Sequence, residues 1–275
     1  MATPQPHADR IVARLSEAKP QLQRAFGQHP SIPHCYLDDL LDERAARSIY
    51  RAFPPKEQMF PLKTLQRQHK YVLMQMDQVD PILAEIIYAF QDPRVVALVG
   101  EITGLAQLRP DPELYAGGIS LMEEGGFLHP HLDNSHDRRR QLYRCLNLLY
   151  YVTPDWQTGY GGNLELWDQG LRYPCRTIES RFNRLVMMMT HQSSWHSVSR
   201  VCHPGRRCCV SNYYFSAQPP RAKPYTHITS FRGRPEEPWR DVILRADTWV
   251  RRLAPGSLKN ILRQPQHYDQ DSDKQ

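Results

Sequence analysis

The segment 125–137, Gly-Gly-Phe-Leu-His-Pro-His-Leu-Asp-Asn-Ser-His-Asp, concentrates side chains that could bind a metal ion. The segments on either side of it have the composition of β-strands. His131 and Asp133 are two positions apart, and in an extended strand residues i and i+2 point to the same face. An imidazole and a carboxylate should therefore converge on one point. A third donor, His196, lies in the segment 194–198, Ser-Trp-His-Ser-Val, again in a strand-like context.

Two histidines and one carboxylate on one face of a metal leave the opposite coordination positions open, which is the arrangement that non-haem Fe(II) oxygenases use. The sequence thus predicts a metal site of His131, Asp133 and His196. A competing interpretation is a cupin-like site built on His129 and His131, which would share a strand face, with His136 as a further donor. In that case the protein would bind a metal without being an oxygenase.

Further motifs follow in order: the run Leu-Asn-Leu-Leu-Tyr-Tyr at 146–151, Asp155-Trp156, Gly-Gly-Asn-Leu at 161–164, His-Ser-Val at 196–198, and Arg207 before a Tyr-Tyr-Phe strand. Over about residues 110–217 the chain resembles the Fe(II)/2-oxoglutarate-dependent oxygenases of the prolyl 4-hydroxylase type. The resemblance implies Fe(II), 2-oxoglutarate and dioxygen as cofactor and co-substrates, with ascorbate as a stimulant. It also implies hydroxylation rather than halogenation, because in the related halogenases a small residue replaces the Asp133 carboxylate.

A chelating keto acid has a second carboxylate inside the barrel, and this charge needs a fixed cation, ideally a guanidinium. Arg206 and Arg207 lie ten and eleven positions after His196. Only one of two adjacent strand residues faces inward. Alignment with the arginine-to-aromatic strand of the family selects Arg207, with Ser211 on the same face as a hydroxyl donor.

The strand expected at 144–152 should supply the other side of the co-substrate site. Asn147 and Tyr151 share a face there, and Tyr151 matches the family tyrosine that hydrogen-bonds the distal carboxylate. Tyr150 is the alternative, since a register slip of one residue exchanges the two faces. The neighbours of the metal ligands that could face the substrate are Asn134, Ser135 and Trp195.

The elements that must position these residues are short strands separated by Gly, Pro and polar turns, which indicate an antiparallel sandwich or barrel. We expect strands at 115–122, 129–133, 144–152, 163–167, 176–178, 184–189, 194–198 and 206–216. The family resemblance implies a double-stranded β-helix, a jelly-roll (cupin-like) barrel whose mouth holds the metal.

Helices should flank this core within a single domain over residues 1–275. The helical N-terminal part, 1–109, has expected helices at 9–28 and 43–52 and after Asp80 and Asp92. The jelly-roll core covers 110–217, and a helical extension, 218–275, contains an amphipathic helix after Pro238 and a polar tail from Gln264. The polar stretch 57–78, which holds Lys63, Arg67, His69 and Lys70, is expected to be an irregular loop or a substrate-facing lid.

Composition sets the remaining bounds. The net charge is +6 and the pI about 9.0, a diffuse positive field that favours anionic ligands but does not indicate nucleic-acid binding. The six cysteines form no CxxC pair, which favours free thiols in a cytoplasmic protein. No signal-like or membrane-length apolar run occurs. The substrate class favoured is a small or carrier-held molecule, such as a sugar or an amino acid. The alternative is peptidyl proline, and the sequence does not indicate the oligomeric state.

Overall fold

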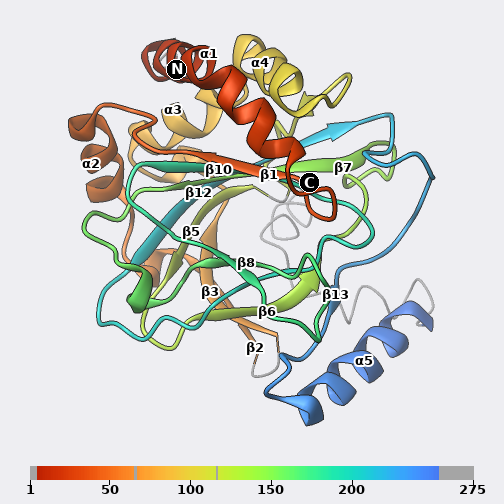
Figure 1. Cartoon of the computed structure of the whole chain (residues 1–275). Coiled ribbons are helices and arrows are strands. Elements are labelled where there is room, and N and C mark those ends of the chain that lie inside the picture. Colours follow the sequence, from red (N-terminus) through yellow and green to blue (C-terminus); the bar gives the residue numbers. More distant parts are fainter. Residues whose placement is uncertain (1–4, 65–66, 116, 254–275) are drawn as a thin grey trace, which may run out of the picture.

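The computed structural model describes residues 5–64, 67–115 and 117–253 (Figure 1). A mainly antiparallel sheet curls into a half-barrel that helices flank, which confirms the predicted fold class. The helices are α1 (Gln5–Gly27), α2 (Glu43–Ala52), α3 (Pro81–Ala89), α4 (Pro93–Thr103) and α5 (Pro238–Leu253). The strands are β1 (His34–Leu37), β2 (Phe60–Thr64), β3 (Gln68–Leu73), β4 (Arg109–Pro110), β5 (Gly118–Met122), β6 (Phe127–Leu132), β7 (Tyr143–Tyr151), β8 (Leu164–Leu166), β9 (Arg176–Ile178), β10 (Arg184–Met189), β11 (His196–Val198), β12 (Arg207–Ser216) and β13 (Ser230–Phe231).

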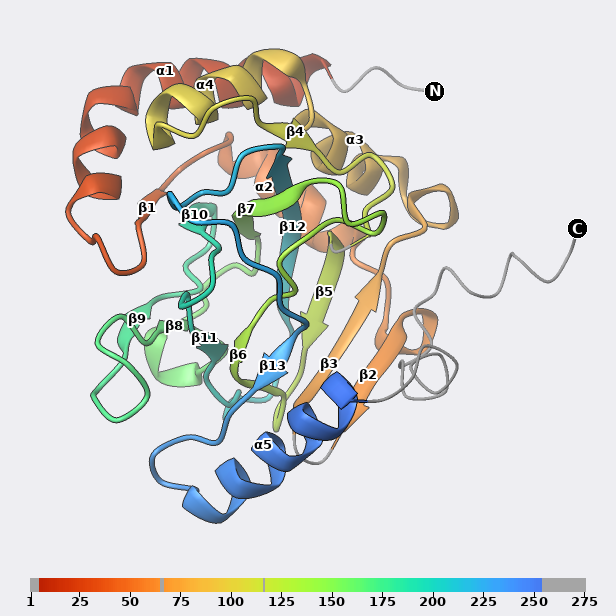
Figure 2. The same cartoon turned by 90° about the vertical axis from the view of Figure 1, so that its right-hand side faces the viewer.

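The strand order is β1-β10-β7-β12-β5-β3-β6-β11-β8-β9, with β2, β4 and β13 attached to its members. The larger half of the sheet consists of β1, β10, β7, β12 and β5. The smaller half consists of β6, β11, β8 and β9. Strand β3 joins them, since it pairs with both β5 and β6. The view in Figure 2 shows β5, β3 and β2 running beside one another, with β6 and β13 next to them.

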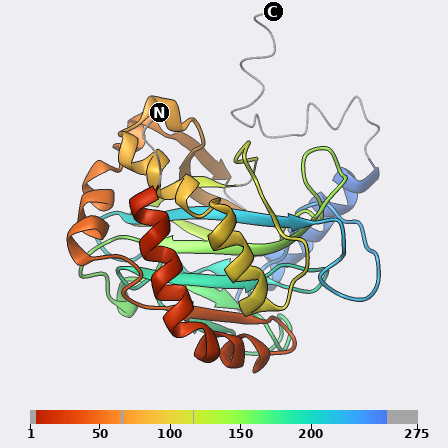
Figure 3. The ribbon, with the colours of Figure 1, turned by 90° about the horizontal axis from the view of Figure 1, so that it is seen from above.

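Helices cover the outer face of the larger half. In Figure 3, α1 and α4 lie side by side across the sheet, in agreement with their extensive contacts. Their apolar faces, including Ile11, Leu15 and Val99, share one core with outward-facing strand residues such as Leu148 and Tyr150. This layer is a scaffold, because it leaves the inner face of the sheet to the functional groups.

Local sequence signals set the ends of these helices. Asp80 and Asp92 cap α3 and α4, since each carboxylate accepts a hydrogen bond from the backbone N–H two residues later, and a proline occupies the first helical position. Gly104, at φ +70°, ends α4. Asp42 directly precedes α2 but makes no side-chain capping bond.

Each strand predicted between 115 and 216 is present, with ends that differ by at most about three residues from the prediction. The prediction for 57–78 as an irregular loop is wrong, because this stretch forms the hairpin of β2 and β3. The strand β3 was not predicted because polar residues interrupt its apolar alternation. Its alternate positions Tyr71 and Leu73 are buried in the helix-side core.

Helix α5 lies beneath the barrel, beside β13 and β6 (Figure 2). Leu244 is buried, and ion pairs such as Arg232–Asp241 and Arg67–Asp247 tie the helix to the sheet. The amphipathic helix expected after Pro238 is present, but its apolar residues Trp239 and Trp249 are largely exposed. The predicted polar tail lies outside the described residues. No helix in the described ranges is both long and apolar enough to cross a membrane.

Candidate metal centre

Strand pairing brings the three predicted metal ligands together. His196 opens β11 and lies directly opposite His131 on the antiparallel strand β6, while Asp133 follows the last residue of β6. The two imidazole rings are 4.1 Å apart between centroids. One ligand atom from each of His131, Asp133 and His196 lies within 4.8 Å of the others, and this is the one such group among the described residues.

Backbone hydrogen bonds fix the orientation of both imidazoles. His131 Nδ1 lies 3.0 Å from the carbonyl oxygen of His129, and His196 Nδ1 lies 2.9 Å from that of Ser194. Each Nδ1–H therefore donates to a carbonyl, and each Nε2 keeps a free lone pair. These Nε2 atoms are 3.7 Å and 3.8 Å from the two carboxylate oxygens of Asp133. Such outer hydrogen bonds set the tautomer that a metal-binding histidine needs.

The protonation states also suit a divalent cation. Burial lowers the pKa of His131 to about 3, and the nearby His196 imidazole adds to this effect. Burial alone would raise the pKa of Asp133, but Arg144 and the two imidazoles outweigh it and lower that pKa to about 2. Oδ2 of Asp133 is buried and accepts no hydrogen bond. A buried, unpartnered carboxylate oxygen is costly, and a bound cation would remove that cost.

Arg144 is a component that the sequence analysis did not single out. Its Nη1 lies 3.4 Å from Asp133 Oδ1, and its guanidinium stacks on the Tyr213 ring at 4.5 Å from the centroid. The side chain is buried, so the pair with Asp133 is shielded from water. The available signal was a charged residue near the start of an otherwise apolar strand.

The competing cupin-like site is not assembled. Opposite β11, strand β6 contains an irregularity between the positions paired with His196 and Val198, so that one extra residue is accommodated there. This bulge lies between Leu128 and His131 and breaks the alternation that placed His129 beside His131. His129 Nε2 instead lies 2.7 Å from Arg240 Nη1 of α5. His136 bonds to Ser135 through Nδ1 at 2.7 Å.

Arg206 and Arg207 point to opposite sides of β12. Arg207 is buried, its Nε donates to the carbonyl oxygen of Gly162 at 3.0 Å, and its guanidinium lies 4.6 Å from the centroid of the Tyr151 ring. In the described part of the chain, no carboxylate pairs with it. Arg206 faces the helices, where its Nη1 donates to the carbonyl oxygen of Phe53 at 3.0 Å.

The two tyrosines of β7 are divided in the same way. Tyr150 faces the helices and its hydroxyl donates to Asn183 Oδ1 at 2.7 Å. Tyr151 faces the barrel, and its buried hydroxyl has no hydrogen-bond partner. Burial raises the pKa of Tyr151, which keeps the hydroxyl protonated and able to donate. The Arg207–Tyr151 corner thus offers a guanidinium and a hydroxyl to one anion.

Ser211 and Asn147 also belong to the inner face, at different depths. Ser211 lies opposite Leu149 on β7, and its Oγ is 3.7 Å from Cys209 Sγ. Asn147 pairs with Tyr213, and its Oδ1 is buried without a partner. Four residues along a strand span roughly 13 Å, so Asn147 lies toward Arg144 and the metal ligands rather than beside Tyr151.

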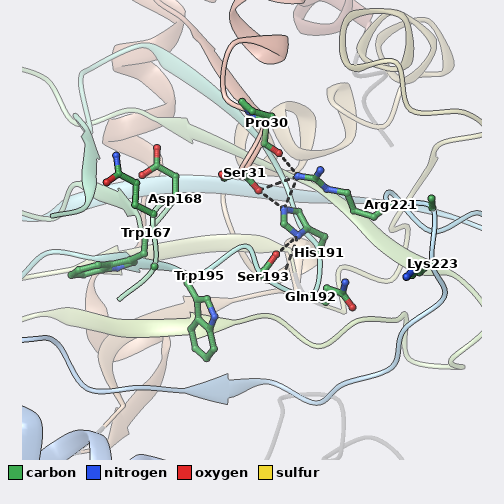
Figure 4. A pocket seen from close by; sticks show the side chains of 13 residues that line it. Pro30, Ser31, Trp167, Asp168, His191, Gln192, Ser193, Trp195, Arg221 and Lys223 are labelled. Carbon is green, nitrogen blue, oxygen red and sulfur yellow. Dashed lines mark hydrogen bonds between the residues drawn. The ribbon is translucent and has the colours of Figure 1, made fainter. Parts of the chain in front are cut away.

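The predicted substrate-side positions fall into two groups. Asn134 and Ser135 hold their own loop, since Asn134 Nδ2 donates to the carbonyl oxygen of His136 and Ser135 Oγ to that of His227. Trp195 instead lines a surface pocket of about 700 Å³, together with Trp167 and Arg221 (Figure 4). None of the metal ligands lines this pocket, although Trp195 directly precedes His196.

Residues 117–215 match the family model of the 2OG-Fe(II) oxygenase superfamily, and this segment contains all three metal-site residues and Arg207. Members of this superfamily use Fe(II), 2-oxoglutarate and dioxygen, and residues 117–215 of this chain supply a His-Asp-His group that fits an iron site. No curated protein matches the chain.

Solved structures share the fold of this chain at low sequence identity. A Pseudomonas putida prolyl-4-hydroxylase has a TM-score of 0.53 at 14% identity, with 71% of this chain and 98% of that chain covered. A Trichoplax adhaerens prolyl hydroxylase in complex with a hypoxia inducible factor peptide fragment has a TM-score of 0.53 at 15% identity, with 74% and 92% covered. HygX from Streptomyces hygroscopicus, with nickel, 2-oxoglutarate and hygromycin B bound, has a TM-score of 0.50 at 13% identity, with 70% and 86% covered.

Proposed function

We propose that the protein is an Fe(II)- and 2-oxoglutarate-dependent dioxygenase that hydroxylates an unactivated C–H bond of a small-molecule, sugar or amino-acid-type substrate and releases succinate and CO2. The observation that carries the proposal is the convergence of His131, Asp133 and His196 inside a half-barrel that also buries Arg207 without a carboxylate partner. A buried guanidinium that lacks a counter-charge is costly, and the distal carboxylate of 2-oxoglutarate would remove this cost.

In this proposal His131, Asp133 and His196 hold the iron, and their backbone and Arg144 contacts keep them oriented before the metal binds. When bound, the iron couples the oxidative decarboxylation of 2-oxoglutarate to oxidation of the substrate. Arg207 and the Tyr151 hydroxyl bind the distal carboxylate. Buried apolar residues around them exclude water from this contact, which strengthens it.

Ser211 and Asn147 are proposed as further polar groups of the co-substrate site, Ser211 beside the Arg207 strand and Asn147 nearer the metal. Ascorbate would act as a stimulant by keeping the iron reduced. All six cysteines are free in the structure, which fits the reducing cytoplasmic compartment that we propose.

Peptidyl proline is a second candidate substrate. The Trichoplax adhaerens structure contains a peptide fragment, whereas HygX contains hygromycin B, so this fold accommodates bound molecules of both kinds. A substrate panel of free amino acids, sugars and proline-containing peptides would separate the two candidates, because only a protein hydroxylase would require the peptide.

The co-substrate assignment is tested by the two adjacent arginines. Arg207→Met should weaken 2-oxoglutarate binding to the metal-loaded protein by roughly 30-fold or more, because a buried charge partner is lost. Arg206→Met removes the same charge from the opposite face of β12 and should leave this binding unchanged. Calorimetric titration measures both constants, with metal binding as the control for an intact site. Equal effects of the two substitutions would contradict the proposal and favour a metal-binding protein that does not use 2-oxoglutarate.

A further inference from the structure

Lys70 lies on the inner face of the half-barrel, in the strand that the sequence analysis missed. Its neighbour Tyr71 packs into the helix-side core, so Lys70 must point to the opposite side of β3. Tyr71 pairs with Leu121 on β5, which places Lys70 opposite Met122, and Met122 pairs with Arg207 on β12. Residues directly opposite one another in antiparallel strands share a face. Lys70 and Arg207 therefore stand in one row, two strand spacings or roughly 10 Å apart.

Charges of the proposed active site act on the Lys70 ammonium. Burial lowers the pKa of Lys70, Asp133 opposes this effect, and Arg207 reinforces it. The Lys70 ammonium is therefore within range of the charges of both Asp133 and Arg207, in agreement with its place on the inner face. Lys70 nevertheless keeps some exposed surface, and its side chain makes no hydrogen bond or ion pair with any residue that the structure describes.

The other charges of the site are already matched. Asp133 pairs with Arg144, the distal carboxylate of 2-oxoglutarate would pair with Arg207, and its chelating carboxylate would pair with the iron. These pairings leave Lys70 as a surplus positive charge among protein atoms. A charge in such a place is stabilised only when an anion meets it, and the remaining molecule that enters the site is the substrate.

We propose that Lys70 binds an anionic oxygen group of the substrate, a carboxylate or a phosphate, so that this oxygenase acts on anions. The inference rests on the function proposed above. The same chemistry could be supplied by a carboxylate of 2-oxoglutarate itself, and the experiment has to separate these two sources.

Nickel-loaded protein allows binding to be measured without turnover. In a first titration, 2-oxoglutarate is added to wild type and Lys70→Gln. In a second titration, sulfate is added at low ionic strength to the nickel and 2-oxoglutarate complexes. Lys63→Gln is the matched control, because Lys63 is an exposed lysine of the same hairpin, opposite His69. Lys70→Arg keeps the charge and controls for packing.

We expect Lys70→Gln to bind 2-oxoglutarate with an affinity within about threefold of wild type. Its affinity for sulfate should be lower than that of wild type by roughly tenfold or more. Lys63→Gln and Lys70→Arg should keep the wild-type affinity for sulfate. If Lys70→Gln instead weakens 2-oxoglutarate binding, Lys70 is a co-substrate anchor and the inference of an anionic substrate is overturned. It is also overturned if wild type and Lys70→Gln bind sulfate alike. Failure of the wild-type nickel protein to bind 2-oxoglutarate would instead refute the proposed function.

Discussion

Tyr150 and Tyr151 are adjacent in sequence, but their hydroxyl groups have opposite roles in the structure. The Tyr150 hydroxyl completes a hydrogen bond to Asn183 in the helix-side core, and the Tyr151 hydroxyl faces the barrel unpaired, near the Arg207 guanidinium. The Tyr150 hydroxyl therefore stabilises the folded protein, whereas the Tyr151 hydroxyl is available to bind a ligand.

Replacing each tyrosine by phenylalanine should separate these two roles. Tyr150→Phe should lower the free energy of unfolding by about 1–3 kcal/mol, because Asn183 Oδ1 loses one of its buried hydrogen-bond donors. This substitution should leave 2-oxoglutarate binding unchanged. Tyr151→Phe should leave stability within about 0.5 kcal/mol of wild type, since its hydroxyl has no partner, and should weaken 2-oxoglutarate binding. Denaturant unfolding and ligand titration measure the two quantities. If Tyr150→Phe weakened 2-oxoglutarate binding and Tyr151→Phe did not, the assignment of the co-substrate site to the Tyr151 face of β7 would be contradicted.

At this scale the sequence was informative where the signal was local. Side chains alternate regularly between the two faces of a strand. This alternation predicted that His131 and Asp133 share a face and that Arg206 and Arg207 point to opposite faces. Arg144 could not be found in this way, since its contact with Asp133 depends on how the loop after β6 returns to β7. The expectation that His129 shares a strand face with His131 fails, because the bulge in β6 interrupts the alternation.

At the scale of elements, β3 is the strand on which the site depends. It joins the two halves of the barrel, places Lys70 in the same row as Arg207, and approaches β5 very closely at Gly118. A Cβ atom at Gly118 would lie 2.4 Å from the carbonyl oxygen of Leu73, and the residue has φ +108°. Only glycine therefore fits where β3 and β5 meet.

Gly118→Ala should consequently destabilise the protein by about 3 kcal/mol or more, because both a backbone clash and an unfavourable φ must be relieved. Gly125→Ala is the matched control: Gly125 also has a positive φ, +80°, but a Cβ there would meet nothing within 4 Å. The control should cost only about 1 kcal/mol, the strain of the backbone alone. Thermal and denaturant unfolding of both variants measure the difference, and equal losses would show that the close approach of β3 and β5 is not a constraint.

The strands of the core were predictable because their apolar runs are bounded by clear turn residues, whereas β3 was hidden by its polar inner face. Two of the polar residues that made 57–78 resemble a loop, Gln68 and Lys70, lie on the side of β3 opposite the core residues Tyr71 and Leu73. A strand with a functional inner face loses the apolar alternation on which its recognition depends.

At the scale of the whole molecule, the two parts of the proposed site belong to different halves of the sheet. His131 and His196 lie on the smaller half, and Arg207 and Tyr151 on the larger half. Periodicity cannot reveal a strand order such as β12-β5-β3-β6, because each pairing joins residues far apart in the chain. The family resemblance supplied the jelly-roll fold, and the pairing of β6 with β11 explains how it assembles the ligands.

The central claim is that this barrel oxidises 2-oxoglutarate with iron held by His131, Asp133 and His196. The most direct measurement is succinate formation by purified protein that is loaded anaerobically with Fe(II) and then given 2-oxoglutarate and air. Wild type and His129→Ala should form succinate, because His129 contacts Arg240 and not the metal group, whereas His131→Ala should form none. A wild-type protein that binds iron but neither binds nor consumes 2-oxoglutarate, or a His131→Ala variant as active as wild type, would contradict the claim.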